Sequence, residues 1–263
     1  MKEGGAAALR DLTKGLSMYE LWWVTSYSEI QLRYRRSVIG PFWLTLNMLI
    51  LIGTLGVVYS VLFKQDLRTY IPFLATGFLV WGLISAIITD SCNTFVNSTS
   101  IIKNTNLPFS VFVFRDLSKN LLIFLHNASI LIPIYLLWPE YLTPWSLIAI
   151  PALGLILANG IWVTLLLGII CARYRDVSLM VSNLLQISMF LTPIFWPPSA
   201  VGTRVFVLNF NPFYHALTIA RMSLLGQPAP LSSWLIMLAI TVVGSLLTFG
   251  IFSRYRKRIA FAL

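Results

Sequence analysis

Long stretches without a charged residue dominate this chain and set its predicted architecture. A helix that crosses the hydrocarbon core of a bilayer needs about 20 mostly apolar residues. Six stretches free of Asp, Glu, Lys and Arg are long enough, and they predict six membrane-spanning α-helices. The fold class that we expect is therefore an all-α integral membrane protein. The predicted spans lie near residues 41–63, 70–90, 118–138, 147–171, 177–197 and 232–253.

A seventh uncharged stretch, residues 205–220, is too short to span a bilayer and carries Asn209, Asn211, Pro212 and His215. Polar groups and helix breakers at membrane depth are tolerated only where protein or a water-filled cavity can satisfy the backbone. We therefore interpret the region between spans five and six as short re-entrant helices. Prolines at 193, 197 and 198 break the end of span five, which agrees with this interpretation.

Residues 18–38, just before the first span, have the pattern of an amphipathic helix. Trp23, Tyr27, Ile30 and Tyr34 fall on one helical face, and a basic face lies opposite it. This pattern is typical of a helix in the membrane interface, although a cytoplasmic helix packed on the rest of the protein would show it too. The residues expected at the lipid headgroups are Trp22, Trp23, Arg33, Arg35 and Arg36.

Composition supports a membrane protein and excludes an ordinary soluble one. Hydrophobic residues make up 57% of the 263 residues, charged residues only 11%, and the mean hydropathy is +0.80. A soluble domain carries about 25% charged residues, so this chain has too few charges to cover a water-facing surface. Its two cysteines are too few for a disulfide scaffold or a zinc domain.

The distribution of Lys and Arg predicts the orientation in the membrane. Of the 19 basic residues, 15 fall in the N-terminal segment, the second and fourth loops and the C-terminal tail. Cytoplasmic segments carry such an excess, so both termini are expected in the cytoplasm. The expected organisation is a cytoplasmic N-terminus with an interfacial helix over 1–40, a six-span domain over 41–253 and a basic tail over 254–263.

Motifs for catalysis and for energy coupling are missing from the sequence. There is no GxxxxGK[ST] phosphate-binding loop, and the nine acidic residues are scattered singly. A membrane enzyme that transfers a lipid phosphate would need clustered acids, His or Arg, and a proton-driven flippase would need carboxylates inside its spans. The sequence disfavours both, so transport against a gradient would take its energy from a partner.

Five segments, taken in order, resemble the membrane subunit of ABC-2-type transporters. More narrowly, they resemble the permeases that export O-antigen, capsule or teichoic-acid polymers. The resemblance covers nearly the whole chain. The segments are RYRRSVIGPFWLTLNML at 33–49, ARYRDV at 172–177, LTPIFWPP at 191–198, LNFNPFYHALTIARMSLLG at 208–226 and FSRYRKRIA at 252–260.

The resemblance implies a partner, a cargo and a location. The chain would form a homodimer bound to two copies of a cytoplasmic ABC ATPase, with ATP and magnesium in that subunit and no cofactor in this chain. The cargo would be a polysaccharide linked to undecaprenyl diphosphate, exported across the bacterial cytoplasmic (inner) membrane. The alternative is an ABC-2 permease that exports a drug or another lipid.

The resemblance also implies roles for three segments. Residues 18–37 would be the interface helix, and residues 198–226 would form gate helices on the extracytoplasmic side. The loop around 95–117 would contact the ATPase. The coupling residues would be Asn106, Pro108, Arg115 and Asp116, and the gate region would include Pro193, Pro197, Asn211 and Pro212.

Aromatic residues of spans one and two are the predicted wall of the channel at the homodimer interface. Flat rings can stack on the C–H faces of sugars without charged groups, and 14% of the chain is aromatic. With a rise of about 1.5 Å per residue, Tyr59, Phe63 and Phe73 lie at a similar depth near the outer surface, and Trp81 lies near the middle of the membrane. The alternative is that these rings are ordinary interfacial anchors.

Overall fold

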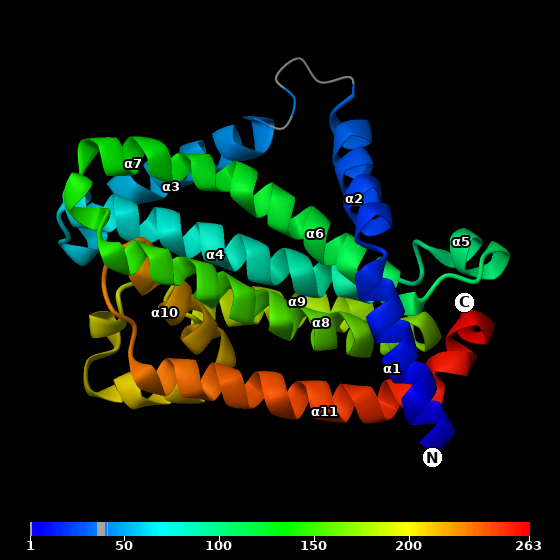
Figure 1. Ribbon diagram of the computed structural model, residues 1–263. Helices are drawn as coiled ribbons and strands as arrows, with labels where there is room; N and C mark the ends of the chain where they lie inside the picture. Colours follow the sequence, from blue (N-terminus) through cyan, green and yellow to red (C-terminus); the bar gives the residue numbers. More distant parts are fainter. Residues whose placement is uncertain (1, 36–39, 41) are drawn as a thin grey trace.

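The computed structural model describes residues 2–35, 40 and 42–263, and this part of the chain is helical with no β-strand (Figure 1). The all-α fold class is therefore confirmed. Long helices lie side by side along one direction, and α1 (Lys2–Ser17) and α2 (Tyr19–Tyr34) cross one end of them. The N- and C-termini lie at this same end.

Five helical segments are long and apolar enough to cross a membrane, namely Thr45–Phe63, Leu67–Asn93, Phe109–Leu137, Pro144–Arg173 and Leu231–Arg256. They match the first four predicted spans and the last one. The predicted fifth span contains α9 (Val177–Leu191), a helix of 15 residues that ends where Thr192 and Pro193 turn the chain. The number of six spans stays a prediction, because α9 alone is shorter than a usual span.

The bundle is built around α4 (Leu67–Asn93), whose inner face supplies much of the hydrophobic core. Around α4 pack α3 (Phe42–Phe63), α6 (Phe109–Asn127), α8 (Ala149–Arg173), α9 and α10 (Pro212–Leu224). The last helix, α11 (Leu231–Ala262), packs along α8 and continues through the predicted tail without a break. Short elements complete the chain: α5 (Thr99–Asn104), η1 (Ala128–Ile130), α7 (Leu131–Leu137), η2 (Pro139–Tyr141), η3 (Pro144–Ile148) and η4 (Pro198–Phe210).

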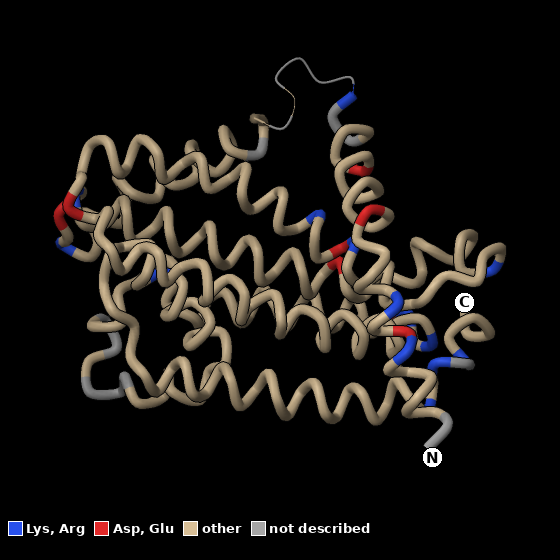
Figure 2. Tube along the Cα trace, viewed as in Figure 1, with Lys and Arg blue, Asp and Glu red and all other residues tan. Residues whose placement is uncertain are grey.

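Charged residues gather at the two ends of the bundle, and the end with the termini holds most of the basic ones (Figure 2). This arrangement is the one that a bilayer around the middle of the helices requires. At the opposite end, Arg68 and Glu140 form an exposed ion pair with 2.7 Å between Nη2 and Oε1. A backbone hydrogen bond, together with the hydrogen bond from Arg68, lowers the pKa of the Glu140 carboxyl.

The structure corrects one predicted boundary. The predicted spans leave residues 91–117 as a loop, but α6 begins at Phe109, so Arg115 and Asp116 lie on a helix. Charged residues at 115, 116 and 119 end the uncharged stretch that predicts the third span. The helix extends further because these charges are paired inside the protein.

The N-terminal helix α1 was not predicted, and tertiary contacts hold it in place. Asp11 accepts hydrogen bonds from the backbone N–H groups of Phe109 and Ser110, at 3.2 and 3.0 Å. These N–H groups open α6 and have no partner within that helix, so Asp11 caps it from another element. Arg256 of α11 pairs with the same carboxylate at 2.7 Å. Asp11 therefore ties α1, α6 and α11 together.

Candidate functional site

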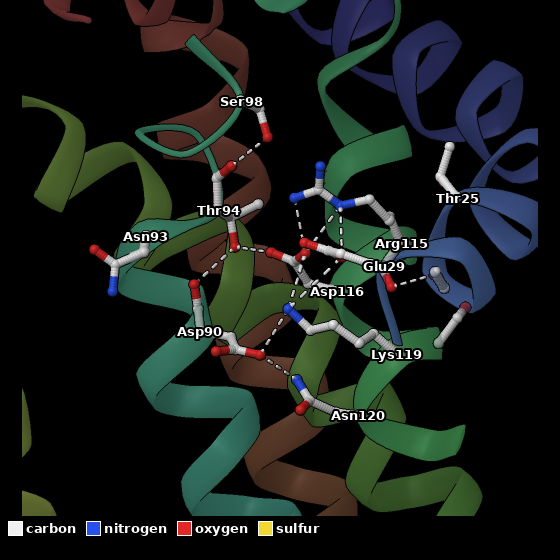
Figure 3. Close-up of polar contacts among 12 residues, drawn as sticks. Thr25, Glu29, Asp90, Asn93, Thr94, Ser98, Arg115, Asp116, Lys119 and Asn120 are labelled. Atoms are coloured by element: carbon white, nitrogen blue, oxygen red, sulfur yellow. Dashed lines mark hydrogen bonds and ion pairs between the residues drawn. The ribbon is translucent and has the colours of Figure 1, made fainter. Parts of the chain in front are cut away.

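A charged network lies where α2, α4 and α6 meet (Figure 3), at the end of the bundle that α1 and α2 cross (Figure 1). We define it as Glu29, Asp90, Arg115, Asp116 and Lys119. Arg115 donates hydrogen bonds from Nε and Nη2 to Oδ1 of Asp116, at 3.0 and 2.8 Å. Lys119 Nζ lies 3.0 Å from Asp90 Oδ2, 3.8 Å from Asp116 and 3.9 Å from Glu29. Two cations are thus shared among three carboxylates.

Neutral groups complete the charged network. Thr94 Oγ1 donates to Asp116 Oδ2 at 2.7 Å, and Asn120 Nδ2 donates to Asp90 at 3.0 Å. Ser26 of α2 donates to the carbonyl of Arg115 at 2.7 Å. Because buried charges are costly unless they are paired and hydrogen-bonded, this network fixes how α2 sits on α6 and α4.

The four predicted coupling residues do not share one surface. The side chains of Arg115 and Asp116 are 13% and 5% exposed and face each other inside the protein. Pro108 is buried at the start of α6, and Asn106 is exposed beside it. Two of the four therefore face the interior of the protein, where they are paired, and one of the other two is exposed. Their role in coupling stays a prediction.

Within the loop around 95–117, which the resemblance assigns to the ATPase contact, the structure contains a short helix that was not predicted. The short helix α5 projects from the end of the bundle that carries the termini (Figure 1). It exposes Ile101, at 43%, together with Lys103 and Asn104. An apolar pair at 101–102 within an otherwise polar loop was the signal that could have revealed it.

Three of the four predicted channel residues come together in an outer aromatic cluster, which we define as Tyr59, Phe63, Tyr70, Phe73 and Phe195. Tyr59 stacks on Phe195 at 5.9 Å between ring centroids and contacts Phe63 at 5.8 Å. Tyr70 contacts Phe63 at 6.3 Å and stacks on Phe73 at 6.0 Å. The Tyr70 hydroxyl donates to the carbonyl of Phe195. The cluster joins α3, α4 and the turn after α9.

Trp81, the fourth predicted channel residue, lies apart from this cluster. It is 6% exposed and packs edge-on against Phe213 of α10, with 5.6 Å between the rings. Its separation from the other three agrees with its predicted depth near the middle of the membrane, but its ring is buried within the chain, and its role in the channel stays a prediction. Tyr70 and Phe195 were not predicted at the channel, although Tyr70 begins the second predicted span and Phe195 lies within the segment LTPIFWPP at 191–198.

The predicted gate residues cap and anchor the short helices between α9 and α11. Asn211 accepts from the backbone N–H of Phe213 at 2.9 Å and so caps α10, and Pro212 occupies the first helical position, where no N–H is needed. Asn211 also donates to Thr192 Oγ1 at 2.9 Å. Pro193 is buried and Pro197 precedes η4. The described residues there form η4, which is kinked at Gly202, and α10; their function as a gate stays a prediction.

The structure describes the side chains of three of the five residues predicted at the lipid headgroups. Trp22 is half-buried against Phe114 of α6, with 6.0 Å between the rings, whereas Trp23 is 44% exposed and Arg35 is exposed. Arg36 and the side chain of Arg33 lie outside the described residues. Helix α2 thus packs one edge on α6 and leaves apolar side chains such as Trp23 uncovered.

An apolar cavity of about 660 Å³ lies among α4, α8, α9, α10 and α11. Its side-chain amide, Asn159, is already committed: it donates to Leu155 O and Thr241 Oγ1 and accepts from Trp162 Nε1. The Asn159 amide is therefore already hydrogen-bonded within the protein and is not available to bind a sugar in the cavity. Among the described residues, no group of three or more His, Cys, Asp and Glu is placed to hold a metal.

Together, the apolar helices and the charged ends define a multi-pass membrane protein. The model of the ABC-2 type transporter family matches residues 20–225, and the chain belongs to this family of membrane transport permeases. It is similar to an O-antigen export system permease protein RfbA of Myxococcus xanthus, with 24% identity over 72% of this chain and 74% of the relative. Two proteins of that name from Klebsiella pneumoniae are 24% and 25% identical over 74% of this chain and 76% of theirs.

Proposed function

We propose that this chain is the transmembrane subunit of an exporter that moves an O-antigen-like polysaccharide, linked to undecaprenyl diphosphate, across the bacterial inner membrane. The observation that supports this cargo most directly is the similarity to three O-antigen export permeases over about three quarters of their length. Energy comes from ATP hydrolysis in a separate subunit that holds ATP and magnesium. This chain needs no cofactor of its own.

The outer aromatic cluster supports a sugar cargo rather than a charged one. Its rings present flat apolar faces, and its Tyr59 and Phe63 are half-buried, so part of each ring is available. Aromatic rings interact with apolar faces without a fixed hydrogen-bond register. A long chain of sugars can therefore move past such rings without stopping at one position.

A homodimer with the channel at its interface is part of the proposal. The apolar segment of α3 is only 17% buried within the chain, so most of its surface remains for lipid or for a second copy. Because α3 carries Tyr59 and Phe63, pairing of two chains along α3 would bring two outer aromatic clusters to one path. The distribution of basic residues supports an orientation with both termini in the cytoplasm.

The ATPase is proposed to bind at the end of the bundle where α5 projects. Ile101 supplies an exposed apolar contact, and Lys103 and Asn104 surround it with polar groups. Movement of α5 would reach the spans directly, because α5 follows α4 within a few residues. The charged network would carry the same movement to α6 and to α2.

The test is the removal of this chain from its own host. We expect polysaccharide to disappear from the cell surface and the lipid-linked polymer to accumulate inside, and both defects to be reversed when the chain is supplied again. Normal surface polysaccharide, with loss of resistance to a toxic compound or of another exported lipid, would favour the alternative cargo of a drug or lipid.

A further inference from the structure

Arg221 of α10 is a buried cation within the helical bundle and is only 5% exposed. Its guanidinium donates from Nη1 to the carbonyl of Pro193 at 2.7 Å and from Nη2 to the carbonyl of Ile194 at 2.9 Å. Its Cζ atom lies 4.0 Å from the centre of the Phe73 ring. The side chain thus reaches from α10 to the turn after α9 and to α4.

No carboxylate balances this charge among the residues that the structure describes. None of the ion pairs found there includes Arg221, and its Nε has no hydrogen-bond partner. The guanidinium is instead stabilised by two carbonyl oxygens and by the face of one aromatic ring. An ionisable residue at such a position is expected to serve function rather than stability alone.

The fit of Arg221 depends on a glycine in the facing helix. A Cβ atom at Gly77 of α4 would lie 2.2 Å from Arg221 Nη2 and 2.7 Å from the carbonyl oxygen of Ile194. Any side chain at position 77 would therefore push apart the guanidinium and the carbonyl that it holds. Gly77 and Arg221 form one contact that two different helices supply.

The turn held by Arg221 carries a member of the outer aromatic cluster. Phe195 directly follows the two clamped carbonyls, and it stacks on Tyr59 of α3. The Tyr70 hydroxyl holds the carbonyl of the same residue. If the carbonyls of Pro193 and Ile194 were released, one of the anchors that keep Phe195 on Tyr59 would be lost.

We propose that Arg221 is a positioning residue for the export path, which clamps the turn at residues 193–195 so that Phe195 closes on Tyr59. This inference rests on the proposed export function and names the contact that must open when polymer leaves. The planar fork of arginine suits two neighbouring carbonyls, whereas lysine is a point charge that cannot reproduce the fork. The arrangement in the structure is then the closed one.

The test measures how fast a cysteine at the clamped turn reacts with a membrane-impermeant maleimide added from outside. Ile194→Cys serves as the probe, because Ile194 is fully buried in the closed arrangement. We expect slow labelling when Arg221 is present, labelling at least ten times faster with Arg221→Met, and an intermediate rate with Arg221→Lys. Gly77→Ala should act like Arg221→Met, since it breaks the same contact from the other helix.

Two matched variants serve as controls. Arg68→Met removes an exposed arginine at the same end of the bundle. Gly82→Ala adds a Cβ on α4 that would lie 3.9 Å from the Met48 side chain, which is ordinary van der Waals contact. Neither should change the labelling rate. Unchanged rates with both Arg221→Met and Gly77→Ala would overturn the proposal, and so would failure of both proteins to fold, which would assign Arg221 to stability alone.

The labelling requires neither polysaccharide nor ATPase, so it separates this inference from the proposed function. If Arg221→Met speeds labelling but the protein exports another cargo, the clamp by Arg221 is supported and the polysaccharide cargo is contradicted. If Arg221→Met labels as slowly as the protein with Arg221, and the protein does export polysaccharide, the clamp is contradicted and the proposed function is supported.

Discussion

Asp116 is the residue on which the charged network depends, because it accepts hydrogen bonds from Arg115 and Thr94 and also faces Lys119. Asp116→Ala would leave two buried cations short of a partner. Loss of one member of a buried ion pair costs about 3–5 kcal/mol, so we expect a clear fall in the thermal unfolding temperature of the detergent-purified protein.

The matched control is Glu140→Ala, which breaks the exposed pair with Arg68 at the other end of the bundle. Exposed ion pairs contribute little because water screens them, so this variant should unfold at nearly the wild-type temperature. An equal loss of stability in both variants would contradict the importance given to burial of the charged network.

Tyr59 and Phe63 are the residues of the outer aromatic cluster that belong to α3 and remain partly uncovered. Phe73 is less informative because the Arg221 guanidinium covers its face. We expect the double substitution Tyr59→Ala and Phe63→Ala to reduce the amount of exported polymer several-fold, while the chain still folds and binds its ATPase. Surface polysaccharide measured in complemented cells provides the test.

Trp145→Ala is the control for loss of an aromatic ring, because Trp145 is 47% exposed and lies outside the outer aromatic cluster. Export should be unchanged in that variant. Wild-type export by the double variant would show that the rings at 59 and 63 are interfacial anchors, and the channel would then have to lie along other faces.

At the scale of helices, Gly244 lets α11 approach α8 closely. A Cβ at this position would lie 2.4 Å from the Trp162 ring, and the adjoining Asn159 amide donates to Thr241 at 2.7 Å. Gly244→Ala forces the ring aside, and overpacking of this kind costs about 1–3 kcal/mol. The expected result is a lower unfolding temperature than that of the unaltered protein.

Gly250→Ala tests the same helix without the contact, since a Cβ there would meet no atom within 4 Å. Alanine is favoured over glycine in helices, so this variant should be as stable as the unaltered protein or slightly more so. A loss of stability as large as that of Gly244→Ala would contradict the close packing of α8 on α11.

Helix α5 is the element through which the ATPase is proposed to bind. Ile101→Glu replaces its exposed apolar side chain by a charge, and we expect the ATPase to be lost on co-purification while the permease stays folded. Ser100→Glu places the same charge on the neighbouring exposed residue and should keep the ATPase bound. If Ile101→Glu still retains the ATPase, the ATPase must bind at a surface other than Ile101 of α5.

The helices were predictable from the sequence where they are uncharged and long, and less so elsewhere. Spans one to four and six follow from the lack of charge, since each needs about 20 apolar residues. The extension of α6 to Phe109 did not follow, because the burial of Arg115 and Asp116 depends on carboxylates and hydroxyls of other helices. Helix α1 was missed because Asp11 ties it to residues about 100 and 245 positions away.

For the molecule as a whole, helical geometry predicted which aromatic residues lie together, but not which charged residues are buried. Tyr59, Phe63 and Phe73 were brought together correctly by depth in the membrane, a property that helical rise alone supplies. The burial of Trp81 against Phe213 could not be predicted in this way, since depth does not tell which way a side chain points. Arg221 lies within the segment 208–226 that carries the resemblance, yet its contacts with residues 193 and 194 arise only when α10 folds back on the turn after α9.

Reconstituted transport is the most direct test of the proposed export function. The purified chain would be placed in lipid vesicles together with its ATPase, with lipid-linked polysaccharide on the ATPase side. We predict movement of polymer to the other side only when ATP and magnesium are present, and neither movement nor ATP hydrolysis by this chain alone. Two results would contradict the proposed export function. One is ATP-dependent transport of other lipids with no transport of the polysaccharide, and the other is transport by this chain without the ATPase.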